Sequence, residues 1–177
     1  MTLSSRQEAH TLLEKYIQNP ALRHHCVMVA TAMEAYARKY GEEAELWYQT
    51  GLLHDLDYEE FPDQHPFKAA NELLSGYPPE LIRSVLAHGP EITGVEPISS
   101  MERYLFACDE LSGFMHAYSL MRPDGFNGMQ AGKILKKLTD LNFAAKVNRS
   151  DIEKGFSLIN EDPVSHIQFL ITTFANA

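Results

Sequence analysis

The stretch GLLHDLDYE, residues 51–59, places a histidine beside an aspartate at the end of an apolar helix. Trp47 and Gly51 share one face of that helix with His54, because residues three and seven positions apart lie on the same side. Asp55 follows His54 directly. A carboxylate beside an apolar helix is costly to bury unless a cation or hydrogen bonds compensate. The stretch therefore indicates a buried polar site, and a plain helix end with Asp55 in a turn is the alternative interpretation.

Three more polar side chains recur on apolar helical faces outside that stretch. His25 lies on the apolar stripe of the helix that follows Pro20, and His88 lies on the apolar face of a later helix. Asp109 stands in the middle of YLFACDELSGF, residues 104–114. Histidine and aspartate are common ligands of borderline to hard divalent cations. Their recurrence in one short helical chain predicts that these side chains converge on a metal.

Each of these positions also has a simpler interpretation. A single histidine on an apolar face is more often a hydrogen-bonded core residue, which applies to His88 in particular. Asp109 has Arg103 or Lys133 as alternative partners. The metal interpretation is favoured because at least four such positions occur together.

The chain has helical periodicity throughout and no alternating strand pattern of useful length. Helices are expected over about residues 5–18, 20–41, 43–54, 66–76, 79–88, 99–121, 129–140, 151–160 and 164–175, with loops over 57–64 and 89–97. Capping boxes are expected at Ser5 and at Ser150. We predict an all-α helical bundle, with a core over residues 1–121. Residues 122–177 form a small helical extension packed on the same core, since about fifty residues bury too little apolar surface alone.

Composition narrows the class of protein. The 177 residues are 45% hydrophobic and 22% charged, and 24 acidic against 15 basic side chains give a formal charge of -9. A nucleic acid polymer or an anionic membrane surface needs a broad basic patch, so neither is an expected partner. No apolar run approaches the ~18 residues of a membrane helix. The N-terminus lacks the pattern of a signal peptide, so we expect a cytoplasmic protein.

Taken together, these motifs resemble the HD superfamily of metal-dependent phosphohydrolases. The resemblance runs from about residue 22 to residue 114 and rests on HxxxVA (25–30), GLLHDLDYE (51–59), HPFKAA (65–70), LAHG (86–89) and ACDELSGF (107–114). It implies an HD-domain helical bundle. It also implies that His25, His54, Asp55 and Asp109 are metal ligands.

The resemblance extends to members of the family that bind two metals. HD-GYP phosphodiesterases and symmetrical dinucleoside tetraphosphatases add two histidines between the HD pair and the last aspartate. His65 and His88 lie in the corresponding places, and HPFKAA and LAHG are similar to the tetraphosphatase pattern. This implies a second ion, with Asp55 as the bridge. The chain lacks a GYP motif, lacks a histidine pair at His88 and has a short loop from Asp55 to His65, which disfavours cyclic di-GMP hydrolysis.

The activity that the resemblance implies is hydrolysis of a small phosphate ester, with a nucleotide as one candidate. Water activated by one or two divalent ions would attack the phosphorus. The ligand types suit manganese, iron, cobalt, nickel, zinc or magnesium. Asp55 and Asp57 are the expected catalytic residues, with Asp57 as a proton shuttle, because single-metal relatives carry an acidic residue shortly after the HD pair. An ordinary solvated acidic loop is the alternative for Asp57.

Candidate substrate-binding residues follow the metal ligands along the chain. Lys68 comes one helical turn after His65, and Arg122 and Lys133 are further cations for the phosphate. His116 lies two turns beyond Asp109, so we expect it to line the pocket. Each of the three cations is equally well explained as a surface charge. Two other functions remain open: oxidation by a di-iron centre, which some HD proteins with six matching ligands perform, and a non-catalytic regulatory module.

Overall fold

The structure is a computed structural model that describes residues 3–177. Within that range the chain is helical and has no strand, which confirms the all-α prediction. Its elements are α1 (Arg6–Tyr16), α2 (Pro20–Tyr40), α3 (Ala44–Leu53), η1 (Pro62–Gln64), η2 (Ala69–Leu73), α4 (Pro79–Ala87), α5 (Pro90–Thr93), α6 (Ser100–Ser119), α7 (Ala131–Leu138), α8 (Arg149–Ile159) and α9 (Pro163–Ala175). None of the helices in residues 3–177 is long and apolar enough to cross a membrane.

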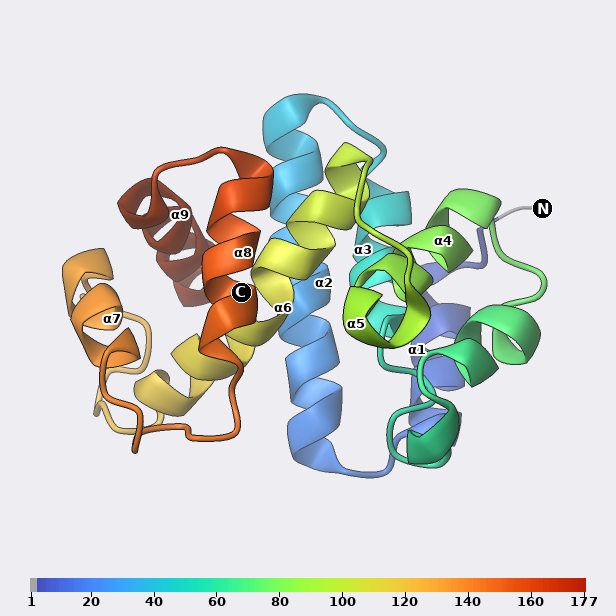
Figure 1. Cartoon of the computed structure of the whole chain (residues 1–177), viewed down its shortest axis with the longest axis horizontal. Coiled ribbons are helices and arrows are strands. Elements are labelled where there is room, and N and C mark those ends of the chain that lie inside the picture. The colour runs from blue at the N-terminus through green and yellow to red at the C-terminus, as the bar shows by residue number, and fades with distance from the viewer. Residues whose placement is uncertain (1–2) are drawn as a thin grey trace.

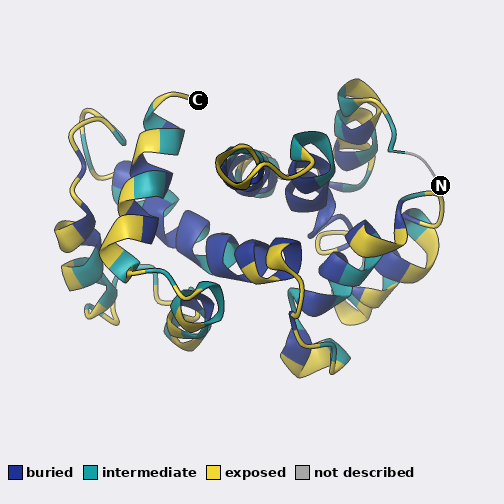
Figure 2. Ribbon diagram, turned by 90° about the horizontal axis from the view of Figure 1, so that it is seen from above, coloured by how far each residue is buried: buried dark blue, intermediate teal, exposed yellow. Residues whose placement is uncertain are grey.

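Two long helices, α2 and α6, pack against each other in the middle of the molecule (Figure 1). Helices α1, α3, α4 and α5 lie on one side of this pair, and α7, α8 and α9 lie on the other. Buried positions face the interior, whereas exposed positions follow the outer faces of the helices (Figure 2). The residues predicted to bind metal come from the central pair and from the side of the molecule that holds α3 and α4.

The C-terminal helices share a core with the central pair. Ile134, Ile152 and Leu170, from α7, α8 and α9, are buried in the same cluster as Met33 of α2 and Leu105 of α6. A second cluster joins α1, α3 and α4 to the other face of α2. Burial of apolar surface in these two clusters is the main force that fixes α2 and α6 relative to their neighbours.

Glycines allow two of these helix pairs to approach closely. A Cβ atom on Gly51 of α3 would lie 2.8 Å from the Cα atom of Ala30 on α2. A Cβ atom on Gly155 of α8 would lie 2.8 Å from the Cα atom of Ala107 on α6. Real Cβ contacts are longer than this, so both positions require glycine unless the helices move apart.

Helix starts agree with the sequence at one expected cap and differ at another. Ser5 forms the expected capping box with Glu8 at the start of α1. The box expected at Ser150 is wrong, because α8 begins two residues earlier. The side chain of Asn148 accepts hydrogen bonds from the backbone N–H groups of Ser150 and Asp151 instead. Asparagine is as good an N-cap as serine, and a tetrapeptide pattern does not distinguish between them.

Two segments differ from the expected helices and loops. The helix expected over residues 66–76 is a π-helical turn at Ala69–Leu73. The N–H of Ala69 donates to the side chain of Asp57 rather than to a backbone carbonyl, and the N–H of Leu74 reaches back five residues to Ala69. The loop expected over residues 89–97 contains the short helix α5, which ends at Gly94 with a φ of 70°.

Candidate metal centre

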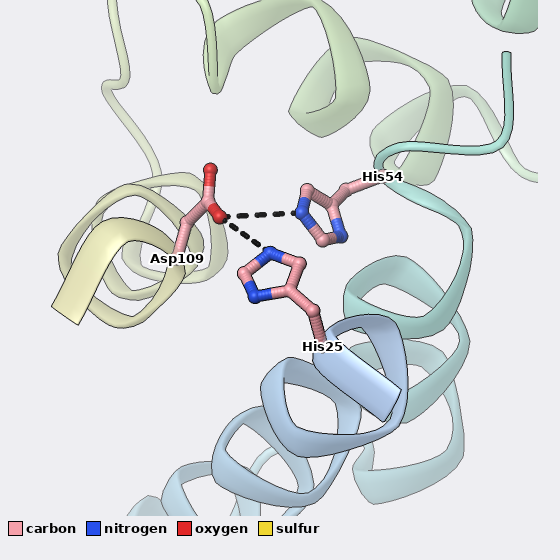
Figure 3. A group of neighbouring side chains, drawn as sticks. All are labelled: His25, His54 and Asp109. Carbon is pink, nitrogen blue, oxygen red and sulfur yellow. Dashed lines mark hydrogen bonds and ion pairs between the residues drawn. The ribbon is translucent and has the colours of Figure 1, made fainter. Parts of the chain in front are cut away.

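The first group of metal-type side chains joins α2, the end of α3 and α6. His25, His54 and Asp109 point toward one another from these three elements (Figure 3). The Nε2 atom of His25 lies 2.9 Å from Oδ1 of Asp109, and the Nε2 atom of His54 lies 3.4 Å from the same oxygen. Their ligand atoms all lie within 4.8 Å of one another, so one ion can contact all three.

The second group consists of Asp55, His65 and His88. The Nε2 atoms of His65 and His88 lie 3.7 and 3.6 Å from Oδ1 of Asp55. The other carboxylate oxygen of Asp55, Oδ2, lies 3.4 Å from Nε2 of His54 and 3.8 Å from Nε2 of His25. One carboxylate therefore faces both groups, one oxygen to each.

Backbone carbonyls orient two of the histidine rings. Nδ1 of His54 donates to the carbonyl of Gly51 over 2.7 Å, and Nδ1 of His88 donates to the carbonyl of Val85. A carbonyl only accepts hydrogen bonds, so in the neutral form of each ring the proton is on Nδ1 and the lone pair is on Nε2. Both Nε2 atoms face the centre of the site. Such an outer hydrogen bond is the usual support of a metal-bound histidine.

A buried carboxylate orients the third ring. Asp57 has no exposed surface. One of its oxygens accepts from Nδ1 of His65 over 2.7 Å, and the other accepts from the N–H of Ala69 over 2.7 Å. Both oxygens are thus engaged in fixing His65 and the turn that follows it. This differs from the solvated loop residue or proton shuttle expected from the sequence, because Asp57 does not line the cavity described below.

Two features of this arrangement call for a cation. The Nε2 atom of His54 is buried and has no hydrogen-bond partner. The Nε2 atoms of His65 and His88 lie 3.2 Å apart while both rings use Nδ1 as a donor. Facing lone pairs repel unless a proton or a metal ion lies between them. The donor set of imidazole nitrogens and carboxylate oxygens fits a divalent metal ion.

The electrostatics of the site also favour positive charge. Burial lowers the pKa of His54, but the carboxylates of Asp55 and Asp109 outweigh it and raise the pKa to about 9. Burial opposes ionisation of the two aspartates as well, yet the neighbouring imidazoles hold the pKa of each well below its usual range. Both carboxylates are therefore ionised, although only 13% of the Asp55 side chain and 20% of the Asp109 side chain are exposed. Buried carboxylates of this kind need a compensating cation.

A cavity of about 370 Å³ opens onto both groups. Its lining includes His25, Asp55, His65, His88 and Asp109, whereas His54 lies behind them with no exposed surface. The rest of the wall is formed by Leu22, Tyr58, Gly89, Glu91, Ile92, Phe106, Glu110, Gly113 and Asp151. The volume is suited to a small molecule.

Three carboxylates in this wall are additional to the ligand groups. Burial and the neighbouring Asp109 raise the pKa of Glu110 to about 7. Burial and the nearby Glu91 raise the pKa of Asp151 above its usual range. The sequence alone does not predict that Glu110 or Asp151 lines the cavity. Glu110 follows Asp109 directly in ACDELSGF and was open to such an interpretation, whereas nothing in the sequence connects α8, with Asp151, to the site.

The residues expected to bind the phosphate lie elsewhere. Lys68 pairs with Glu72 over 2.5 Å, Arg122 donates to the carbonyl of Gly125, and Lys133 borders a different hollow. None of the three lines the cavity, contrary to the sequence-based expectation. Helical spacing after a metal ligand does not specify the side to which a long side chain turns, and nearby partners hold the first two.

His116 also lies outside the lining of the cavity. Its ring packs against that of His24, with centroids 4.4 Å apart. Burial and the neighbouring imidazoles lower its pKa. The expectation that His116 faces the substrate pocket is not matched, because the wall formed by α6 ends at Gly113.

Comparison with protein families agrees with this geometry. The model of the HD domain family matches residues 22–113, more than half of the chain. The chain belongs to the HD domain family. All six residues of the two groups, from His25 to Asp109, lie inside the HD domain, and Asp151 lies outside it. Comparison with curated proteins and with solved structures gave no match.

Proposed function

We propose that this HD domain protein is a metal-dependent phosphohydrolase that cleaves a small phosphate ester, with a nucleotide as one candidate substrate. The observation that carries the proposal is the pair of facing Nε2 atoms of His65 and His88, beside a carboxylate of Asp55 that also faces His25 and His54. Members of the HD family are mostly hydrolases that bind divalent metals.

The two groups assign the ligands. His25, His54 and Asp109 would hold one ion, and His65 and His88 would hold a second, with Asp55 between them. A bound divalent ion lowers the pKa of water toward neutral and polarises a phosphoryl oxygen. In the hydrolysis, water adds to phosphorus, the bond to the ester oxygen breaks, and the products are inorganic phosphate and an alcohol.

The protein's own contribution is orientation and proton transfer. Carbonyls behind His54 and His88, and the buried carboxylate of Asp57, hold the imidazoles in place before a substrate arrives. The leaving alkoxide needs a proton. Glu110 lines the cavity next to Asp109, so its carboxyl group faces the space in which the leaving oxygen would lie and is placed to donate a proton there. We therefore assign proton donation to Glu110, and to Asp57 we assign the positioning of His65.

The test is a panel of small phosphate esters and nucleotides, assayed for phosphate release with each of several divalent metals. We expect release that requires metal, stops with a chelator and returns when metal is restored. Glu110→Gln should slow turnover at least tenfold with unchanged metal content, while Glu153→Gln, on the exposed face of α8, should have no effect. The opposite result is a metal-loaded protein that leaves every ester intact and consumes dioxygen with an organic substrate. That result would contradict the hydrolase proposal and support an oxygenase.

A further inference from the structure

The cavity wall beyond the metal-type groups carries negative charge and no fixed positive charge. Glu91 comes from α5, Glu110 from α6 and Asp151 from α8. Among the described residues that line the cavity, none is a lysine or an arginine. A site for polyphosphates or nucleic acid is lined with such cations, because they bind phosphate oxygens.

Lys154, on the same helix as Asp151, is already paired. The ammonium group of Lys154 lies 3.2 Å from a carboxylate oxygen of Glu96 and packs over the ring of Phe106. It does not line the cavity. Lys154 also stabilises the charge of Asp151, but this single cation is shared with Glu96, so the carboxylates of Glu91 and Asp151 leave the wall with excess negative charge.

These wall carboxylates do not form a third metal site. The groups of side chains whose ligand atoms all lie within 4.8 Å of one another are the two already described, within residues 3–177. Glu91 and Asp151 are too dispersed to surround one small ion together with Glu110. They are nevertheless near enough for Glu91 to raise the pKa of Asp151. This spacing suits an organic cation, which is larger than a metal ion and makes several separate hydrogen bonds.

Charge balance indicates which part of a substrate would meet this wall. Two divalent ions carry four positive charges, Asp55 and Asp109 carry two negative charges, and a phosphate monoester dianion neutralises the remaining two. The ester's phosphate is therefore satisfied at the metal-type groups. Glu91 and Asp151 would face the leaving group, and a second anionic group there would be repelled.

We infer that the pocket selects phosphate monoesters whose alcohol portion carries a protonated amine, which Glu91 of α5 and Asp151 of α8 bind opposite the two metal-type groups. This inference rests on the proposed phosphohydrolase function and narrows its substrate class away from nucleotides. It also gives the helices beyond the HD domain a role, because α8 supplies one of the two specificity-determining carboxylates. The apolar side chains of Ile92 and Phe106 line the same cavity and would contact the carbon chain between amine and phosphate.

The test compares three esters of similar length that differ in the group at the far end: 3-aminopropyl phosphate, butyl phosphate and 2-carboxyethyl phosphate. With metal-loaded protein we expect kcat/KM for the amine to exceed that for butyl phosphate roughly tenfold, and the carboxylate to be poorest. Asp151→Asn and Glu91→Gln should each reduce the preference for the amine severalfold. Glu153→Gln removes the same charge from the exposed side of α8 and should leave the preference unchanged. Equal kcat/KM for the three esters, or a preference for the carboxylate, would overturn the inference and leave the phosphohydrolase proposal intact.

A binding measurement separates the inference from the reaction. Calorimetry with the non-hydrolysable 3-aminopropylphosphonate and butylphosphonate should show roughly tenfold tighter binding of the amine, lost in Asp151→Asn. If no ester is hydrolysed but the amine still binds tighter, the selectivity stands and hydrolysis is wrong. If the two phosphonates bind equally well, the selectivity is wrong whatever the activity.

Discussion

The Nε2 atoms of His65 and His88 lie 3.2 Å apart, although both rings donate their hydrogen bonds through Nδ1. His65 is held by Asp57 and His88 by the carbonyl of Val85, so neither ring is free to turn its donor toward the other. Only a proton or a metal ion between the two nitrogens removes the repulsion of their lone pairs. The nearby carboxylate of Asp55 favours the metal, because it supplies a third ligand atom.

Replacing either of these histidines should remove one ion per chain. His65→Ala and His88→Ala take one ligand each from the second group and leave His25, His54 and Asp109 in place. Elemental analysis after dialysis should show two ions in the unmutated protein and one in each variant. His10→Ala, a change at a histidine that bonds to Tyr48 away from the site, is the control and should keep two. Unchanged metal content in both site variants would contradict the second group.

Asp57→Asn tests the support behind His65. An amide in place of the buried carboxylate keeps its size but loses the charge that holds Nδ1 of His65 and the N–H of Ala69. Loss of such an outer contact typically weakens metal binding by about 10–100-fold. A metal titration should show this loss for one of the two ions only. Glu60→Gln, an exposed carboxylate three residues later, should bind both ions normally. Equal behaviour of the two variants would exclude a positioning role for Asp57.

His166 should make stability depend on pH between about 6.5 and 4. Burial lowers its pKa from 6.5 to about 4, and its ring accepts a 2.5 Å hydrogen bond from the hydroxyl of Tyr36. In this window the unfolded chain binds a proton that the folded chain does not, so the free energy of unfolding falls as the pH is lowered. The shift corresponds to about 3 kcal/mol at the acid end. His166→Gln removes the titration, so urea denaturation of this variant at pH 7 and pH 5 should show a smaller loss than the unmutated protein; an equal loss would exclude His166 as the cause.

The contact between α2 and α3 should tolerate no added methyl group. Gly51→Ala puts a carbon 2.8 Å from Ala30, and the resulting overpacking should cost about 1–3 kcal/mol. His54 caps the end of the same helix, so metal affinity should fall as well. Gly132→Ala is the matched control in α7, where nothing lies within 4 Å, and should be neutral or stabilising by about 0.5–1 kcal/mol. Urea denaturation of the two variants measures the difference, and equal stability would mean that the helices separate at no cost.

The helical fold was predictable because its signals are local. Apolar periodicity and proline positions place α2, α3 and α6 within a few residues, and the capping box at Ser5 marks the start of α1. The π-helical turn after His65 was not predictable. The N–H of Ala69, at its start, donates to the side chain of Asp57, which lies twelve residues earlier in the chain. A tertiary hydrogen bond of that kind leaves no periodic trace in the sequence.

The candidate site was predictable only where carboxylates and imidazoles interrupt apolar helices. His25, His54, Asp55 and Asp109 are conspicuous for that reason, since such groups are rarely buried without a partner. The wall of the cavity was not predictable. Asp151 looks like an ordinary first-turn residue of a helix, and only the packing of α8 on α6 brings it to the cavity.

The most direct test of the central claim is phosphate release from a small monoester as divalent metal is added back to chelator-treated protein. We expect no release without metal, a rise with each addition and a plateau at two ions per chain. Asp55→Ala, which removes the carboxylate shared by the two groups, should abolish the rise. Phosphate release that is undiminished without metal, or absent at every metal content, would contradict the assignment of these residues to a metal-dependent phosphohydrolase.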